Sequence, residues 1–78
     1  MAESDVLLNT LKEHRARLGL TQADLAERVN VSRKTINTVE NGVYIPSTVL
    51  ALRLAHALGV PVETLFRLPA SSTFTKAS

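Results

Sequence analysis

The sequence predicts an all-α fold in which five short helices form one small domain. The chain has 78 residues, of which 45% are apolar and only three are aromatic, so it can bury a single modest core. Apolar residues recur at helical spacing between residues that commonly begin or end helices. There is no internal repeat. We therefore expect one domain over residues 1–68, followed by a polar tail over residues 69–78.

The first predicted helix begins near Ser4 and Asp5, which suit the first turn of a helix, and runs to about Leu18. Gly19 follows and is well suited to end it, because glycine adopts the left-handed conformation common after a helix. The apolar residues of this segment predict a buried stripe made of Leu7, Leu11 and Leu18.

Residues 21–42 predict two short helices joined by a tight turn, and the rest of the chain is organised around them. Thr21 is a favourable N-cap, and Asp24 lies three residues further on, where its carboxylate faces the positive end of the helix. Asn30 tolerates a left-handed backbone and is expected to end the first helix. Ser32 is expected to cap the second.

The second of these helices has two different sides. At about 100° per residue, Ile36 and Val39 share one side. The other side carries a polar arc made of Arg33, Lys34, Asn37, Thr38 and Asn41. All of these are hydrogen-bond donors and none is a carboxylate. Such groups pair with base edges and phosphates in a major groove, so this face is predicted to bind DNA.

One pattern of residues runs through this region and its flanks. Its members are Leu11, Arg15, Gly19, Leu20, Thr21, Gln22, Leu25, Ala26, Val31, Ser32, Arg33, Thr35, Ile36, Glu40, Asn41, Gly42, Pro46 and Ser47. At these positions the chain resembles the phage-repressor and Cro-type helix-turn-helix family. The resemblance extends to about Phe66. It implies a compact five-helix lambda-repressor-like domain with its helix-turn-helix at about residues 21–41. It also implies a sequence-specific regulator of transcription that binds double-stranded DNA.

The resemblance further implies a role for individual residues. Base edges would be read by Arg33, Lys34 and Thr38, with Asn37 as a further base reader. Phosphates would be held by Gln22, Ser32, Thr35 and Asn41, with Arg17 as an additional phosphate contact. Arg15 and Glu40 would form a partly buried ion pair with a structural role, whereas the alternative is that both charges are merely solvated.

The loop after the second helix contains Tyr44 and Ile45, and we expect both to fold under the domain. Ser47 is expected to cap a fourth helix that ends at Gly59. Its predicted core face is Leu50, Ala51, Leu54, Ala55 and Leu58.

Several apolar residues are predicted to contact a second copy of the chain. Val49 and Leu52 lie on the far side of the fourth helix, away from its core face. A fifth helix begins near Pro61, and Leu65, Phe66 and Leu68 are further dimer candidates. For Leu65 and Phe66 the alternative, that they close the core, remains equally open.

The tail contains one aromatic residue, Phe74. Alternation over residues 72–75 is compatible with a short strand across a dimer, with Phe74 as a dimer contact. The composition of the tail favours a flexible segment over this strand.

A single helix-turn-helix unit covers too few base pairs to select an operator. We therefore expect a homodimeric repressor that reads a palindromic operator.

The composition argues against other classes of protein. Without cysteine the chain has no disulfide and no thiolate metal site, and His14 and His56 have no partner at metal spacing. We expect no enzyme activity, no metal and no cofactor. No apolar run approaches the length of a membrane span, and the N-terminus is acidic, so we expect a cytoplasmic protein without a membrane partner.

Two alternatives to a DNA-binding repressor remain. The same fold also serves as a protein-interaction module, for example in an antitoxin-like or bridging subunit. In such modules acidic or apolar residues usually interrupt the polar face that carries Arg33 and Asn37, and here none does. The chain is also compatible with a helical domain of a larger regulator.

Overall fold

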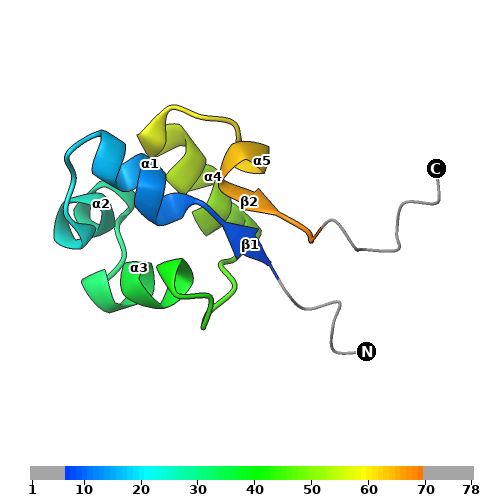
Figure 1. The fold of residues 1–78 in the computed structure, drawn as a ribbon. Helices are drawn as coiled ribbons and strands as arrows, with labels where there is room; N and C mark the ends of the chain where they lie inside the picture. The colour runs from blue at the N-terminus through cyan, green and yellow to red at the C-terminus, as the bar shows by residue number, and fades with distance from the viewer. Residues whose placement is uncertain (1–6, 70–78) are drawn as a thin grey trace.

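The computed structural model describes residues 7–69, and the chain there forms five helices and two very short strands (Figure 1). In chain order these are β1 (Leu8–Asn9), α1 (Leu11–Arg17), α2 (Gln22–Val29), α3 (Arg33–Glu40), α4 (Thr48–Leu58), α5 (Val62–Leu65) and β2 (Phe66–Arg67). The predicted class of a compact five-helix domain is confirmed. The strands are an addition, and pair antiparallel with Leu8 opposite Arg67 and Asn9 opposite Phe66.

The first helix is shorter than predicted, because α1 begins only at Leu11. The preceding residues are tied to distant parts of the chain. The side chain of Asn9 donates to the carbonyl of Val39 (3.1 Å) and accepts from the amide of Leu11 (3.1 Å), while the amide of Thr10 donates to the carbonyl of Leu65 (2.9 Å). These bonds hold residues 8–10 outside the helix. The part of the prediction that concerns residues 1–6 lies outside the described residues.

The predicted buried stripe of the first helix holds only at Leu11. Leu11 is fully buried, but α1 ends at Arg17 and the side chain of Leu18 is 53% exposed. Leu7 precedes β1 and is half-buried. His14 is also half-buried, and its Nδ1 lies 3.0 Å from the carbonyl oxygen of Thr10.

The caps of the central helices are as predicted. Thr21 Oγ1 accepts from the amide of Asp24 (3.0 Å), and the Asp24 carboxylate accepts from the amide of Thr21 (2.9 Å), so both halves of a capping box form. Asn30 adopts a left-handed conformation with φ of 62°, which turns the chain directly from α2 towards α3. Ser32 Oγ accepts from the amide of Thr35 at 3.1 Å.

The core takes apolar side chains from all five helices. Its buried members are Leu11, Leu25, Ala26, Val29, Ile36, Val39, Leu50, Leu54, Ala55, Leu58 and Leu65. Because Leu65 has 0% exposure, its interpretation as a dimer contact is wrong, and it closes the core instead. Phe66 packs partly buried against the same core. Leu68, in contrast, is half exposed.

The loop between α3 and α4 also differs from expectation. Tyr44 and Ile45 are about half exposed and do not fold under the domain. The amides of Val43 and Tyr44 both donate to the carbonyl of Thr38, which holds the loop against the end of α3. The side chains of Tyr44 and Ile45 border a hollow at the surface.

Helix α4 has the two sides that the sequence predicts. Its inner side contributes four of the core residues, and Ala51 is partly buried. Val49 and Leu52 are 59% and 53% exposed on the other side, and His56 is exposed as well. Over residues 7–69 no helix is long and apolar enough to cross a membrane. Phe74 and the rest of residues 70–78 lie outside the described part of the chain.

Candidate nucleic-acid interface

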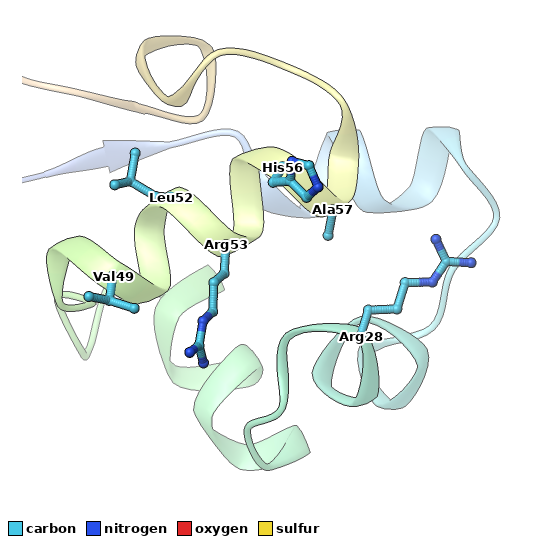
Figure 2. A pocket seen from close by; sticks show the side chains of 6 residues that line it. All are labelled: Arg28, Val49, Leu52, Arg53, His56 and Ala57. Atoms are coloured by element: carbon cyan, nitrogen blue, oxygen red, sulfur yellow. The ribbon is translucent and has the colours of Figure 1, made fainter.

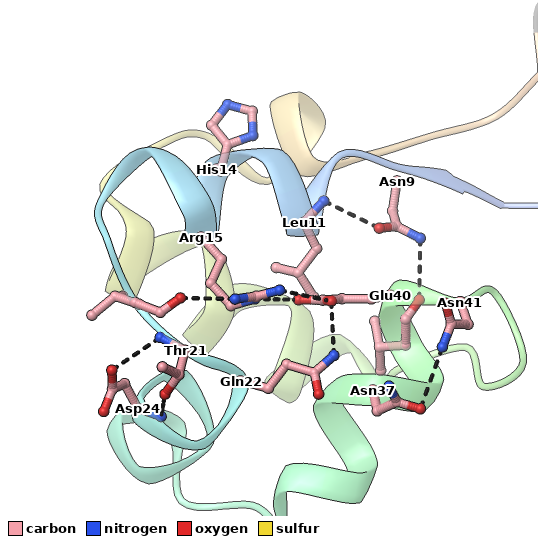
Figure 3. A network of polar contacts seen from close by, with 12 residues as sticks. Asn9, Leu11, His14, Arg15, Thr21, Gln22, Asp24, Asn37, Glu40 and Asn41 are labelled. Atoms are coloured by element: carbon pink, nitrogen blue, oxygen red, sulfur yellow. Dashed lines mark hydrogen bonds and ion pairs between the residues drawn. The ribbon is translucent and has the colours of Figure 1, made fainter.

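The inner side of α3 carries an ionic network centred on Glu40 (Figure 3). Arg15 of α1 binds Glu40 through two nitrogens of its guanidinium. Nε donates to Oε2 at 2.6 Å, and Nη2 donates to Oε1 at 3.2 Å. Gln22 of α2 donates to Oε1 at 3.0 Å. The Arg15 and Glu40 side chains are only 14% and 3% exposed, so the structure places the two residues in a partly buried pair.

This network also holds the turn before α2. Arg15 Nη1 donates to the carbonyl of Leu20 at 2.8 Å, so one guanidinium joins α1, the start of the helix-turn-helix and the end of α3. The hydrogen bond with Glu40 raises the pKa of Arg15, burial opposes this effect, and the charge of Glu40 adds to it. Glu40 is the only acidic residue of α3. Because Arg15 binds it, its charge is compensated inside the domain.

The outer side of α3 carries the predicted base readers. Arg33, Lys34 and Asn37 are exposed. Thr38 is half-buried, and its hydroxyl donates to the carbonyl of Thr35 at 2.9 Å. The Thr38 hydroxyl proton is thus already used within the helix, which leaves its oxygen and methyl group for contact with a base.

One hydrogen bond orders the middle of this outer side. Asn41 Nδ2 donates to Asn37 Oδ1 at 3.3 Å, one helical turn apart (Figure 3). Because the bond uses the oxygen of Asn37, the NH2 group of Asn37 remains available to donate.

A shallow hollow brings α2 and α3 together at the surface. It is lined by Gln22, Arg33, Lys34 and Asn37, so the predicted phosphate contact at the head of α2 lies beside three predicted base readers. Gln22 has two amide N–H groups, and the bond to Glu40 uses one of them. This bond is not readable from the sequence, since Gln22 and Glu40 are 18 residues apart and no local pattern joins them.

The other predicted phosphate contacts are placed less uniformly. Ser32 and Asn41 are exposed at the two ends of α3, while Thr35 is half-buried and its Oγ1 lies 3.0 Å from Ser32 Oγ. Arg17 is exposed at the end of α1. No hydrogen bond among the described residues joins its side chain to α2 or α3.

Residues 7–69 contain no group of three or more histidine, cysteine, aspartate or glutamate side chains close enough to share an ion.

The arrangement of α2 and α3 defines a helix-turn-helix protein. Two eight-residue helices are separated by the left-handed Asn30, and the second presents an exposed polar face. A helix-turn-helix family model matches residues 11–65. The chain therefore belongs to the Cro/C1-type helix-turn-helix family.

Similar proteins agree with this assignment. An uncharacterized HTH-type transcriptional regulator of Methanothermobacter thermautotrophicus is 59% identical over 59 residues, which cover 74% of this chain and 86% of the relative. The crystal structure of the restriction-modification controller protein C.AhdI from Aeromonas hydrophila is 38% identical. Its TM-score is 0.68, and the match covers 72% of this chain and 85% of the C.AhdI chain. A putative DNA-binding protein from Bacteroides fragilis, 28% identical, has a TM-score of 0.72 and covers 78% and 98% of the two chains.

Proposed function

We propose that this protein is a sequence-specific regulator of transcription that reads double-stranded DNA with the outer side of α3. The observation that carries the proposal is the distribution of charge on that helix. Arg33, Lys34 and Asn37 are exposed donors, while Glu40, the only carboxylate, is 3% exposed and bound by Arg15. A helix with this distribution enters a major groove without bringing a negative charge near the phosphates.

Each side chain on this face has a proposed partner in DNA. Arg33 would bind a guanine through its O6 and N7, and the NH2 group of Asn37 would donate to a base. Lys34 and Thr38 complete the set of base readers. The phosphates would be held by Gln22, Ser32, Thr35 and Asn41, with Arg17 as an outlying contact.

The head of α2 is suited to a phosphate for a second reason. The first amides of a helix have no partner within it. The capping box satisfies the amides of Thr21 and Asp24, so the amides of Gln22 and Ala23 are left to face an anion. These contacts would set affinity and register, and they weaken with salt because each neutralised phosphate releases counterions.

We further propose that the protein acts as a homodimeric repressor. One unit reads only a few base pairs, too few to find an operator among competing sites. A two-fold dimer with its two α3 helices about 34 Å apart would read a palindrome with half-sites one helical turn apart. Of the predicted dimer contacts that the structure describes, Val49, Leu52 and Leu68 are exposed. With DNA as its target, the protein would act in the cytoplasm, and it would need no cofactor.

Selection from a pool of random duplexes tests the proposal. Wild type, Arg33→Ala and Arg67→Ala are compared at two salt concentrations. Arg67→Ala is a control that removes the same charge from an exposed position on β2. We expect wild type and the control to enrich one palindrome, and Arg33→Ala to blur it at one symmetric position. If all three proteins bind every duplex equally, the proposal is wrong.

A further inference from the structure

Helices α2 and α4 share a surface that the proposed DNA contacts do not use. Its centre is a groove lined by Arg28 of α2 and, from α4, by Val49, Leu52, Arg53, His56 and Ala57 (Figure 2). Val49 and Leu52 are more than half exposed. Arg53 reaches from α4 along one side of the groove, and Arg28 lies across from it on α2 (Figure 2). The lining of the groove is thus apolar and basic, with no carboxylate among its residues.

An acidic hollow lies directly beside this groove. It is lined by Leu20, Asp24, Glu27 and Arg28, so Arg28 borders both. Asp24, Glu27 and Arg28 are three and four residues apart and therefore share one side of α2. Neither Glu27 nor Arg53 forms an ion pair with another residue of the described range 7–69. The basic groove and the acidic hollow are thus adjacent, and Glu27 and Arg53 have no ion-pair partner within the described chain.

We propose that this α2–α4 face, made of the basic groove and the acidic hollow, binds the α2–α4 face of a second copy of the chain. In a two-fold interface each surface must be complementary to itself, because residue i of one copy contacts residue j of the other and the reverse. Adjacent basic and acidic regions meet this condition. In the proposed dimer Glu27 of one copy pairs with Arg53 of the other, and two-fold symmetry makes this pair form twice.

The distribution of residue types on the face also fits an interface. Stable interfaces have an apolar centre and a charged rim, and complementary charges fix the register of the two partners. Here Val49, Leu52 and Ala57 provide the apolar part. Charges of both signs lie on the same face, with Arg28 and Arg53 in the groove and Asp24 and Glu27 in the acidic hollow. The hollow that Tyr44 and Ile45 line, in contrast, has no charged residue in its lining. Charge complementarity therefore favours the α2–α4 face.

The α2–α4 face leaves the DNA-binding face open. The hollow lined by Gln22, Arg33, Lys34 and Asn37 shares no residue with the basic groove or the acidic hollow. A dimer formed through this face would carry two α3 helices, which deepens the proposed function. Only this pairing of α3 helices on DNA rests on the proposed function, and the contact itself does not.

A charge swap tests the contact. The dissociation constant of the dimer of the full chain is measured by analytical ultracentrifugation for wild type, Glu27→Arg, Arg53→Glu and the double variant. Each single variant places like charges opposite each other twice, and we expect dimerisation to weaken about tenfold or more. The double variant restores opposite charges, and its dissociation constant should return to within about threefold of wild type.

Two further variants serve as controls. Arg67→Glu reverses an exposed charge on β2 and should leave the dissociation constant unchanged. Circular dichroism shows whether each single charge variant folds. If one does not, Leu52→Glu takes its place, because it puts a charge on an exposed apolar residue of the face and should weaken dimerisation. A monomeric wild type, single variants that dimerise like Arg67→Glu, or a folded double variant that is not restored would each overturn the inference.

The same proteins in the duplex selection separate the two proposals. If the charge swap restores the dimer but wild type enriches no DNA sequence, the proposed function is wrong and the contact stands. If Arg33→Ala blurs one base position while the charge variants dimerise normally, the contact is wrong and the proposed function stands.

Discussion

The inner and outer sides of α3 use charge in opposite ways. On the inner side Glu40 accepts from three donors of two residues, and its side chain is 3% exposed. On the outer side Arg33 and Lys34 are exposed and have no ion-pair partner among residues 7–69. Removing one partner of a buried charge pair destabilises the fold, whereas an exposed charge without a partner is available to a ligand. Stability and recognition should therefore respond to different substitutions within one eight-residue helix.

The largest effect is expected from Glu40→Ala. This change removes the partner of a guanidinium that is only 14% exposed and leaves its charge partly buried. Breaking such a pair typically costs about 3 kcal/mol, a large share of the stability of a domain this size. We expect this loss in the free energy of unfolding measured with urea by circular dichroism.

The double variant Arg15→Met/Glu40→Leu is the control for this prediction. It removes both charges and retains most of the buried volume, so it should be clearly more stable than Glu40→Ala. If Glu40→Ala unfolds within about 0.5 kcal/mol of wild type, the pair is a solvated surface contact and the distinction between the two sides of α3 is lost.

Arg33→Ala should have the complementary effect. Loss of a bidentate contact to a guanine would reduce discrimination at one base position by about 1 to 3 kcal/mol. Because Arg33 is exposed, the free energy of unfolding should stay within about 0.5 kcal/mol of wild type. The check pairs titration of the selected duplex and a one-base variant with urea unfolding. A uniform loss of affinity for both duplexes would instead make Arg33 a phosphate contact.

Gln22 lies between the two sides and should affect both properties modestly. Its amide donates to Glu40 and also borders the hollow beside Arg33. We expect Gln22→Ala to lower stability by about 1 kcal/mol, the usual net value of a hydrogen bond. It should also weaken binding to all duplexes about equally and reduce the dependence of affinity on salt. An effect on only one of these properties would show that the side chain serves only one side of α3.

The same distinction explains what the sequence could predict. Thr21, Asp24, Asn30 and Ser32 act on residues within three or four positions, so their chemistry is readable from spacing alone. Periodicity also separates Ile36 from the polar arc of α3, since it defines each side relative to the helix axis. Local signals were therefore sufficient for the helix-turn-helix and for the residues that face outward.

Long-range contacts account for the errors. The start of α1 is set by Asn9, which bonds to a carbonyl 30 residues away, and β1 is too short for an alternating pattern. Leu65 could not be separated from a dimer contact, because an apolar residue at the end of a short helix fits either position. The bond from Gln22 to Glu40 and the adjacent charged regions of the α2–α4 face likewise depend on how helices pack.

The smallest effect concerns Asp24, a carboxylate that is bound like Glu40 but lies on the surface. Its pKa is lowered, mainly because it accepts from the backbone amide of Thr21, and also through the Thr21 hydroxyl and the charge of Arg28. A lowered pKa in the folded state means that ionised Asp24 stabilises the fold above its unfolded pKa, near 3.8. This contribution disappears as the pH falls through the folded value. Asp24→Asn should therefore be less stable than wild type at pH 7, and the difference should shrink in urea unfolding below about pH 4. A difference that is constant with pH would mean that the capping bond of Asp24 acts as a neutral hydrogen bond. Asp24 would then lack the contribution from charge that Glu40 makes on the inner side of α3.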